Sequence, residues 1–167
     1  NLHGIVNPVT FSPDGHYVLS GGYGAGLKLW DVSTGEEIRQ FIGSSATTIV
    51  FSSDGSLALS VGNDKILRSW DVLTGTGKRE FIGNSKEVKA LAISKDNKHA
   101  LSVAIDGTVK MWDMQSGLEV SYFSRLIDWT TSGQFSSDGR CVLLSTGDNN
   151  IQLRDIITAK ELTKFSG

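Results

Sequence analysis

Three short sequence patterns recur along the chain at a shared spacing. The first is a run of four residues: an aromatic or aliphatic residue, Ser, a variable residue and Asp. It begins at Phe11, Phe51, Ile93 and Phe135. The second occupies Trp30-Asp31, Trp70-Asp71, Trp112-Asp113 and Arg154-Asp155, and the third is a phenylalanine at positions 41, 81, 123 and 165. All three repeat at intervals of 40, 42 and 42 residues, so the 167-residue chain consists of four copies of one unit. We place the copies at residues 1–41, 42–81, 82–123 and 124–167.

Each copy predicts four short β-strands. In the second copy, we expect strands over Thr48–Phe51, Leu57–Val61, Ile66–Trp70 and Lys78–Phe81, with Gly- or Asp-containing turns between them. The strands are short and largely apolar, which is typical of sheets covered on both faces. Nineteen glycines against two prolines fit many strands joined by tight turns, so the predicted class is all-β.

The turns follow a chemical pattern. Gly15, Gly55 and Gly139 come directly after an aspartate, where a turn requires positive φ, and Asn97 takes this place in the third copy. A second turn opens at the aspartate after the tryptophan position and closes on glycine in three copies. Ala159 stands at that closing position in the fourth copy, at a cost of roughly 1 kcal/mol if its φ is positive.

The combined pattern resembles the WD40 repeat. The resemblance is carried by Phe-Ser-Pro-Asp-Gly (Phe11–Gly15), by Asp-Gly-Thr-Val-Lys-Met-Trp-Asp (Asp106–Asp113) and by the period, and it covers essentially the whole chain. It implies a β-propeller, in which four-stranded antiparallel blades surround a central channel. It also implies a non-catalytic scaffold for protein–protein contacts.

The chain departs from the family pattern in places. The family often carries Gly-His before the first strand, and that histidine can join the tryptophan, a serine and a turn aspartate in a hydrogen-bonded tetrad. Asn84 stands where the histidine would be in the third copy, and no copy carries the full set. Partial sets remain as Ser60, Asp64 and Trp70, and as Ser102, Asp106 and Trp112. The first copy has Gly24 in place of the turn aspartate, and the fourth has Arg154 in place of the tryptophan. Because every copy is incomplete, we expect looser blades than in a consensus protein.

Four blades would form an open half-ring whose two end faces are apolar. Three alternatives follow: a part of a longer propeller, two copies pairing as a homodimer into an eight-bladed ring, or a closed four-bladed monomer. The chain begins with Asn1, so we expect an excised or processed segment, and no signal peptide or transmembrane segment is visible. The single cysteine, Cys141, allows a reducing compartment, so a cytoplasmic location is favoured.

Composition and spacing argue against several function classes. The net charge of −2 disfavours binding to nucleic acid or to an anionic membrane. The three histidines lack metal-ligand spacing, and no Gly-x-Ser-x-Gly motif occurs. We therefore expect no catalytic residue, metal or cofactor. The aspartates are interpreted as turn caps in the repeat signature, at Asp31, Asp71, Asp113 and Asp155 after the third strand and at Asp64, Asp106 and Asp148 after the second.

A partner is expected on the propeller's upper face. Register places Tyr23, Asn63 and Ile105 beside the turns between second and third strands, and Glu87, Lys89 and Trp129 near the starts of first strands. Exposed aromatic residues are enriched in binding surfaces. The scattered basic residues, including Lys28, Arg68 and Lys110, are interpreted as solvated surface. The predicted function is a protein or peptide interaction scaffold; the alternatives are a purely architectural segment of a larger protein or a small-ligand or enzymatic site at the channel mouth.

Overall fold

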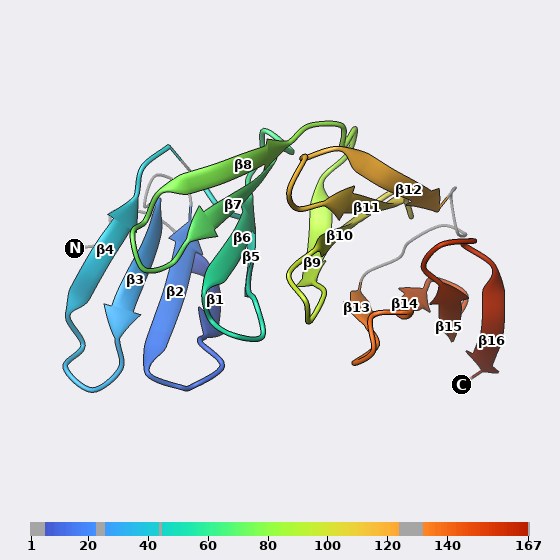
Figure 1. Ribbon diagram of the computed structural model, residues 1–167, viewed down its shortest axis with the longest axis horizontal. Helices are drawn as coiled ribbons and strands as arrows, with labels where there is room; N and C mark the ends of the chain where they lie inside the picture. The colour runs from blue at the N-terminus through green and yellow to red at the C-terminus, as the bar shows by residue number, and fades with distance from the viewer. Residues whose placement is uncertain (1–5, 23–25, 44, 124–131, 167) are drawn as a thin grey trace. The chain divides into compact units, whose positions relative to one another are not determined.

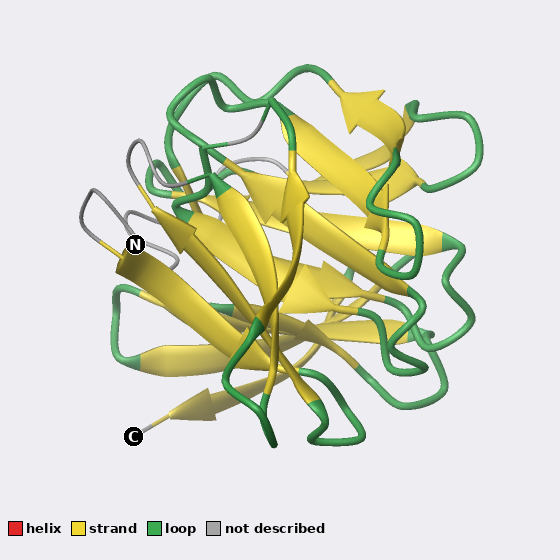
Figure 2. Ribbon diagram, turned by 90° about the vertical axis from the view of Figure 1, so that its left-hand side faces the viewer, coloured by secondary structure: helices red, strands yellow, loops and turns green. Residues whose placement is uncertain are grey.

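The computed structural model describes residues 6–22, 26–43, 45–123 and 132–166, which form sixteen strands (Figure 1). The described residues contain strands joined by turns and loops, and no helix (Figure 2). Within this described part, there is accordingly no helix that could cross a membrane. The chain divides into two compact units, Asn1–Ile82 and Gly83–Gly167.

The first unit contains two four-stranded antiparallel sheets, blades 1 and 2. Each has its strands in sequence order across the sheet. The strands of blade 1 are β1 (Val6–Phe11), β2 (Tyr17–Gly22), β3 (Leu27–Asp31) and β4 (Glu37–Phe41). The strands of blade 2 are β5 (Thr48–Phe51), β6 (Leu57–Val61), β7 (Leu67–Asp71) and β8 (Gly77–Phe81).

The second unit contains blades 3 and 4, which have the same topology. The strands of blade 3 are β9 (Val88–Ile93), β10 (His99–Ala104), β11 (Val109–Asp113) and β12 (Glu119–Phe123). The strands of blade 4 are β13 (Gly133–Phe135), β14 (Cys141–Thr146), β15 (Asn150–Asp155) and β16 (Glu161–Ser166). The predicted fold class is therefore confirmed: the chain is all-β and each sequence copy supplies one four-stranded antiparallel sheet.

The strands of the second copy lie close to their predicted bounds. β5 and β6 coincide with the prediction, whereas β7 begins and ends one residue later and β8 begins one residue earlier. The last pair of the β6–β7 ladder is Val61 with Leu67, because Lys65 has a φ of 63° and the turn extends through Ile66. The chain joins the ladder only after this left-handed residue.

The serine of the first sequence pattern organises the turn between first and second strands. In every blade, its hydroxyl donates a hydrogen bond to the aspartate two residues later and accepts the backbone N–H five residues later. The donated bonds are Ser12–Asp14 (2.5 Å), Ser52–Asp54 (2.6 Å), Ser94–Asp96 (2.7 Å) and Ser136–Asp138 (2.6 Å). The accepted bonds, from Tyr17, Leu57, His99 and Cys141, are all 2.9 Å. This arrangement explains why Ser and Asp recur at this spacing.

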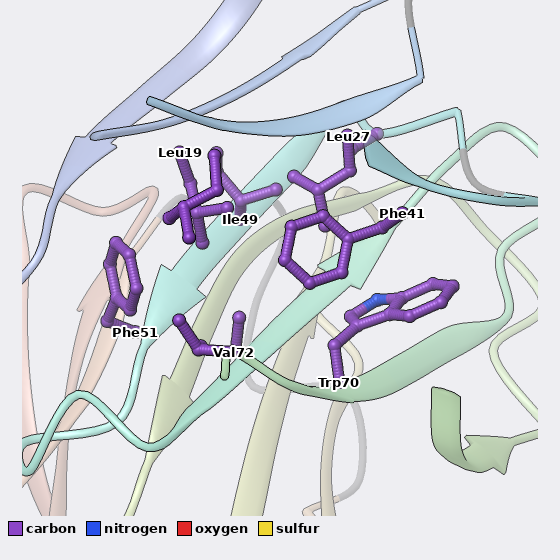
Figure 3. Packing of buried hydrophobic residues seen from close by; sticks show 10 residues of the cluster. Leu19, Leu27, Phe41, Ile49, Phe51, Trp70 and Val72 are labelled. Atoms are coloured by element: carbon purple, nitrogen blue, oxygen red, sulfur yellow. The ribbon is translucent and has the colours of Figure 1, made fainter. Parts of the chain in front are cut away.

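The core of the first unit lies between its two sheets. Leu19, Leu27 and Phe41 of blade 1 belong to the same buried cluster as Ile49 and Trp70 of blade 2 (Figure 3). The Phe41 and Trp70 rings meet edge to face, with centroids 5.7 Å apart and an interplanar angle of 74°. One blade thus buries the face of the next, and this burial provides the main stabilising contribution.

The second unit is built in the same way. Val103 and Val109 of blade 3 share a buried cluster with Val142 and Leu144 of blade 4. A Cβ atom at Gly133, the first residue of β13, would lie only 2.7 Å from Val103 Cγ2. Blade 4 therefore approaches blade 3 so closely that a side chain at this position would force one of them to shift.

Candidate functional site

The aspartates after the third strands bond within their own turns. The carboxylate of each accepts the backbone N–H and hydroxyl of a Ser or Thr two or three residues later. The bonds to backbone nitrogen are Asp31–Ser33 (2.8 Å), Asp71–Thr74 (2.8 Å), Asp113–Ser116 (2.7 Å) and Asp155–Thr158 (2.8 Å). The Ser33 hydroxyl and then the Thr34 N–H lower the pKa of Asp31, because both bonds favour the charged carboxylate. Such carboxylates are occupied in turn formation.

The aspartates after the second strands also bond within their own blades. Asp64 pairs with Arg68 (2.6 Å), Asp106 accepts the Thr108 N–H (3.1 Å), and Asp148 accepts the Thr146 hydroxyl (2.5 Å) and pairs with Lys164 (2.9 Å). The Thr146 hydroxyl, followed by the Lys164 ammonium, holds the pKa of Asp148 well below its usual range. A depressed pKa fits a permanently charged structural carboxylate and opposes a role as a general base near neutral pH.

Each tryptophan of the repeat is anchored by a serine on the second strand of its blade. The indole Nε1–H donates to the Ser20, Ser60 or Ser102 hydroxyl at 2.8 Å, 2.8 Å and 2.9 Å in blades 1, 2 and 3. In blade 3, the Ser102 hydroxyl in turn donates to Asn84 Oδ1 at 3.0 Å. Asn84 therefore takes the role that the resemblance gives to histidine, and the network continues from Trp112 through Ser102 to Asn84.

Blade 4 replaces this anchor with a polar one. Arg154 donates from Nε and Nη2 to Gln152 Oε1 at 3.0 Å and 2.9 Å, and from Nη1 to the Ala159 carbonyl at 2.9 Å. Gln152 is buried, and desolvation lowers the pKa of Arg154, partly offset by Glu161. The guanidinium thus bonds its own strand and the turn that follows it, whereas the indoles of blades 1, 2 and 3 bond the second strand.

The interpretation of Lys28, Arg68 and Lys110 as solvated surface is wrong. Their side chains are only 11%, 16% and 13% exposed. The Lys28 and Lys110 ammonium groups lie over the rings of Trp30 and Trp112, 5.6 Å and 5.5 Å from the ring centroids. Sequence register could have indicated this, since each cation stands two residues before the tryptophan position on the same face of a strand.

Three of the predicted binding residues lie together in blade 3. The Ile105 N–H donates to the Glu87 carbonyl at 2.8 Å, and Lys89 pairs with the Glu87 carboxylate at 2.6 Å. All three residues are exposed, and we call them the blade 3 patch. Asn63 is exposed at the corresponding turn of blade 2. Tyr23 and Trp129 lie outside the described residues.

The remaining candidate chemistry is dispersed. Among the described residues, no group of three or more His, Cys, Asp or Glu side chains is placed to hold a metal ion. Cys141 is a free, half-buried thiol at the start of β14, and His99 occupies the matching strand position in blade 3. The polar side chains of the described residues therefore serve turn formation and surface contact.

These blades define an all-β repeat protein of the propeller-blade type, with a tryptophan anchored to a serine in three of its units. Comparison with protein families agrees: the WD domain, G-beta repeat (WD40) profile matches residues 3–31, 35–71 and 75–113, more than half of the chain. The chain belongs to the WD40 family. The fourth copy, with Arg154 at the tryptophan position, lies beyond these segments. No curated protein matches the chain. WD40 repeats generally mediate protein–protein interactions as scaffolds.

Proposed function

We propose that this chain is a non-catalytic interaction scaffold whose protein partner binds the blade 3 patch. The observation that carries the proposal is the 2.8 Å hydrogen bond from the Ile105 N–H to the Glu87 carbonyl. This bond joins the turn after β10 to the segment that leads into β9. Residues from two separate connections thereby form one exposed surface.

The chemistry of the patch suits a protein partner. An exposed isoleucine lies beside the Glu87–Lys89 ion pair, so an apolar centre has a charged border. Protein interfaces combine an apolar core with a polar rim in this way. By register, Asn63 stands at the corresponding exposed turn of blade 2 and is proposed as a partner contact of that blade.

The test compares capture of partners by variants of the chain. Ile105→Arg places a charge at the apolar centre, and we expect at least about a tenfold loss of partner binding, the effect of losing an interface anchor. Leu118→Arg is the matched control, because Leu118 is exposed in the turn at the opposite end of the same sheet. A partner retained by Ile105→Arg but lost by Leu118→Arg would refute the assignment of this surface.

An architectural role has separate support from the first blade. Val9 and Phe11 on β1 are 66% and 65% exposed. Their register equivalents in blade 2, Ile49 and Phe51, are each 8% exposed because they lie in the cluster shared with blade 1. Apolar side chains at these register positions are therefore exposed in blade 1 and buried in blade 2.

Blade 4 has the complementary feature on its other side. Leu143, Ile151 and Phe165 are 39%, 42% and 50% exposed, whereas the equivalent residues of blade 1 are almost fully buried against blade 2: Leu19 (0%), Leu27 (0%) and Phe41 (1%). We propose that these two faces receive blades of the same repeat. These additional blades belong to a second copy of the chain in an eight-bladed ring, or to further repeats in a longer chain.

A further inference from the structure

A groove of about 650 Å³ lies beside strand β8 in blade 2. All of its lining residues belong to the first unit: they are Ile42, Gly43, Arg68, Trp70 and residues 77–80. The groove is therefore a property of this unit alone. It involves none of the residues of the blade 3 patch.

The groove arises at one repeat position, where blade 2 has a smaller residue than the other blades. The fourth strand carries glutamate at positions 37, 119 and 161, whereas blade 2 carries Gly77 there. In blades 1 and 3, the glutamate accepts a bond from the lysine that stands over the tryptophan, at 2.6 Å (Lys28–Glu37) and 2.7 Å (Lys110–Glu119). Blade 2 has the cation and the tryptophan but lacks this carboxylate.

Arg68, the cation of blade 2, keeps unused donors. Its Nη1 bonds Asp64 at 2.6 Å and its Nε bonds Glu80 at 3.0 Å, while Nη2 makes no hydrogen bond to any residue that the structure describes. A Cβ atom at position 77 would lie 3.4 Å from Trp70 Cζ3, an ordinary contact distance. The space beside the indole is therefore the space that a glutamate enters in the neighbouring copies.

Among the described residues, the border of the groove combines one unpaired cation with an exposed apolar side chain. Lys78 is half exposed and pairs with Asp71 at 3.2 Å, and the exposed Arg79 has no ion-pair partner in the described part of the chain. The lining residues include three cations and one carboxylate, Glu80. Since Asp64 and Glu80 pair with Arg68 and Asp71 pairs with Lys78, Arg79 supplies the positive charge that stays unpaired at the groove. Ile42 is strongly exposed at the other border.

We propose that this groove binds an acidic segment of a partner protein. A carboxylate of that segment takes the position of the missing glutamate, beside Trp70 and within reach of Arg68, and an adjacent apolar side chain contacts Ile42. β8 is the outermost strand of its sheet, so an extended segment can run along it. A carboxylate is favoured over a phosphate because carboxylates fill the equivalent position in blades 1 and 3.

The probe is a short acetylated and amidated peptide in which glutamate alternates with leucine, and its matched control replaces each glutamate with glutamine. The full chain is labelled with ¹⁵N, and the indole N–H signals are followed by NMR, with Trp70→Phe identifying the Trp70 signal. We expect the acidic peptide to shift that signal saturably and the glutamine peptide to leave it unchanged. Binding should weaken as salt rises.

Gly77→Glu gives the decisive comparison, because it supplies the missing carboxylate from within the chain. Affinity for the acidic peptide should fall about tenfold to a hundredfold, the loss expected for a charge-assisted hydrogen bond. The variant should fold, since Glu37 and Glu119 occupy this position in other blades. Gln40→Glu is the matched control: it adds the same charge to the fourth strand of blade 1, outside the groove, and should retain affinity.

A second variant leaves the groove's backbone unchanged. Arg79→Gln should weaken binding less than Gly77→Glu and reduce its dependence on salt. Equal affinity of Gly77→Glu and the parent chain would overturn the proposal. So would shifts confined to Trp30 or Trp112, or tighter binding of a phosphoserine peptide than of the glutamate peptide. Because none of these readouts involves Ile105, failure here is distinguishable from failure of the blade 3 patch.

Discussion

Single side chains connect the strands of each blade, and the Trp–Ser pair is the clearest example. Ser60 and Trp70 are both buried, so the indole N–H of Trp70 depends on the Ser60 hydroxyl. Trp30 is only half buried, so water can reach it more easily than it can reach Trp70. The Trp–Ser hydrogen bond should therefore contribute more to the free energy of unfolding in blade 2 than in blade 1.

We predict that Ser60→Ala lowers the free energy of unfolding by about 1–3 kcal/mol, the cost of leaving a buried donor without its acceptor. Ser20→Ala should cost less than about 1 kcal/mol, because solvent can replace its hydroxyl. Urea denaturation of both variants provides the measurement. Equal losses would show that burial of the indole does not set the strength of this bond.

Ala159 is a second residue whose conformation makes a measurable prediction. Its φ is 58°, where the repeat uses glycine in the other copies. Ala159→Gly should raise the free energy of unfolding by up to about 1 kcal/mol, with the gain reduced by its partial packing against the core of the second unit. Thermal or urea unfolding measures the change, and a clear loss of stability would contradict the account.

Gly35 provides the reverse experiment. It occupies the matching position in blade 1 with a φ of 71°, and a Cβ atom there would meet no atom within 4 Å. Gly35→Ala should therefore cost about 1 kcal/mol through backbone conformation alone. A neutral result would mean that the turn accepts side chains at positive φ without strain.

Residue roles were predictable where the repeat made them periodic. The turn aspartates and the place of Asn84 follow from register, and their hydrogen bonds are those expected of a repeat unit. The covered state of Lys28 and Lys110 was missed because composition says nothing about the neighbouring indole. The groove at Gly77 was missed too, since its origin is an absent side chain and a comparison between copies is needed to find it.

At the scale of elements, many carboxylates of the described residues lie in the hairpin turns and bond within them. Hydrogen bonds, chiefly from Ser and Thr hydroxyls and turn N–H groups, lower the pKa of eight of them. These are Asp14, Asp31, Asp71, Asp96, Asp113, Asp138, Asp148 and Asp155. The turns are therefore the elements most sensitive to acid.

We predict that the free energy of unfolding falls as pH drops below about 4, the ordinary pKa of aspartate in the unfolded chain. Because the folded-state pKa values are lower, the stabilisation is present above that pH and is lost as each folded carboxylate is protonated. Urea denaturation at about pH 7 and about pH 3 measures the effect. In Asp113→Asn, the decline should be shallower, and an unchanged stability between the two pH values would rule out this role for the turns.

Strand positions were predictable to within one residue in blade 2, because turn residues mark both ends of each strand. The one-residue displacement of β7 arises from Lys65, which has a positive φ. Since this position is not a glycine, the sequence did not indicate that conformation. Blade 4 was harder to anticipate. Its first strand is only three residues long, and Arg154 with Gln152 replaces the indole anchor.

At the scale of the whole molecule, the assembly that we propose depends on the exposed faces of blades 1 and 4. Each presents apolar side chains at register positions that an adjacent blade covers elsewhere in the chain. The repeat pattern predicted such faces, but it left open which blades cover them. That depends on surface shape and on chain length, neither of which periodicity specifies.

We predict that the isolated 167-residue chain associates through these faces, with a mass near twice 18.0 kDa by light scattering after gel filtration. Phe165→Glu should dissociate the assembly, because it introduces a charge into the apolar face of blade 4. Gln115→Glu, in the turn between β11 and β12, adds the same charge outside this face and should leave the mass unchanged. A monodisperse species of 18.0 kDa for the parent chain would contradict pairing between copies.

We propose that a protein partner contacts the chain through Glu87, Lys89 and Ile105. The most direct test replaces Ile105 with a photo-crosslinking amino acid in cells of the source organism and places the same group at Leu118 as the control. We expect a discrete protein adduct from position 105 that position 118 does not form. An adduct formed equally from both positions, or only from position 118, would contradict it.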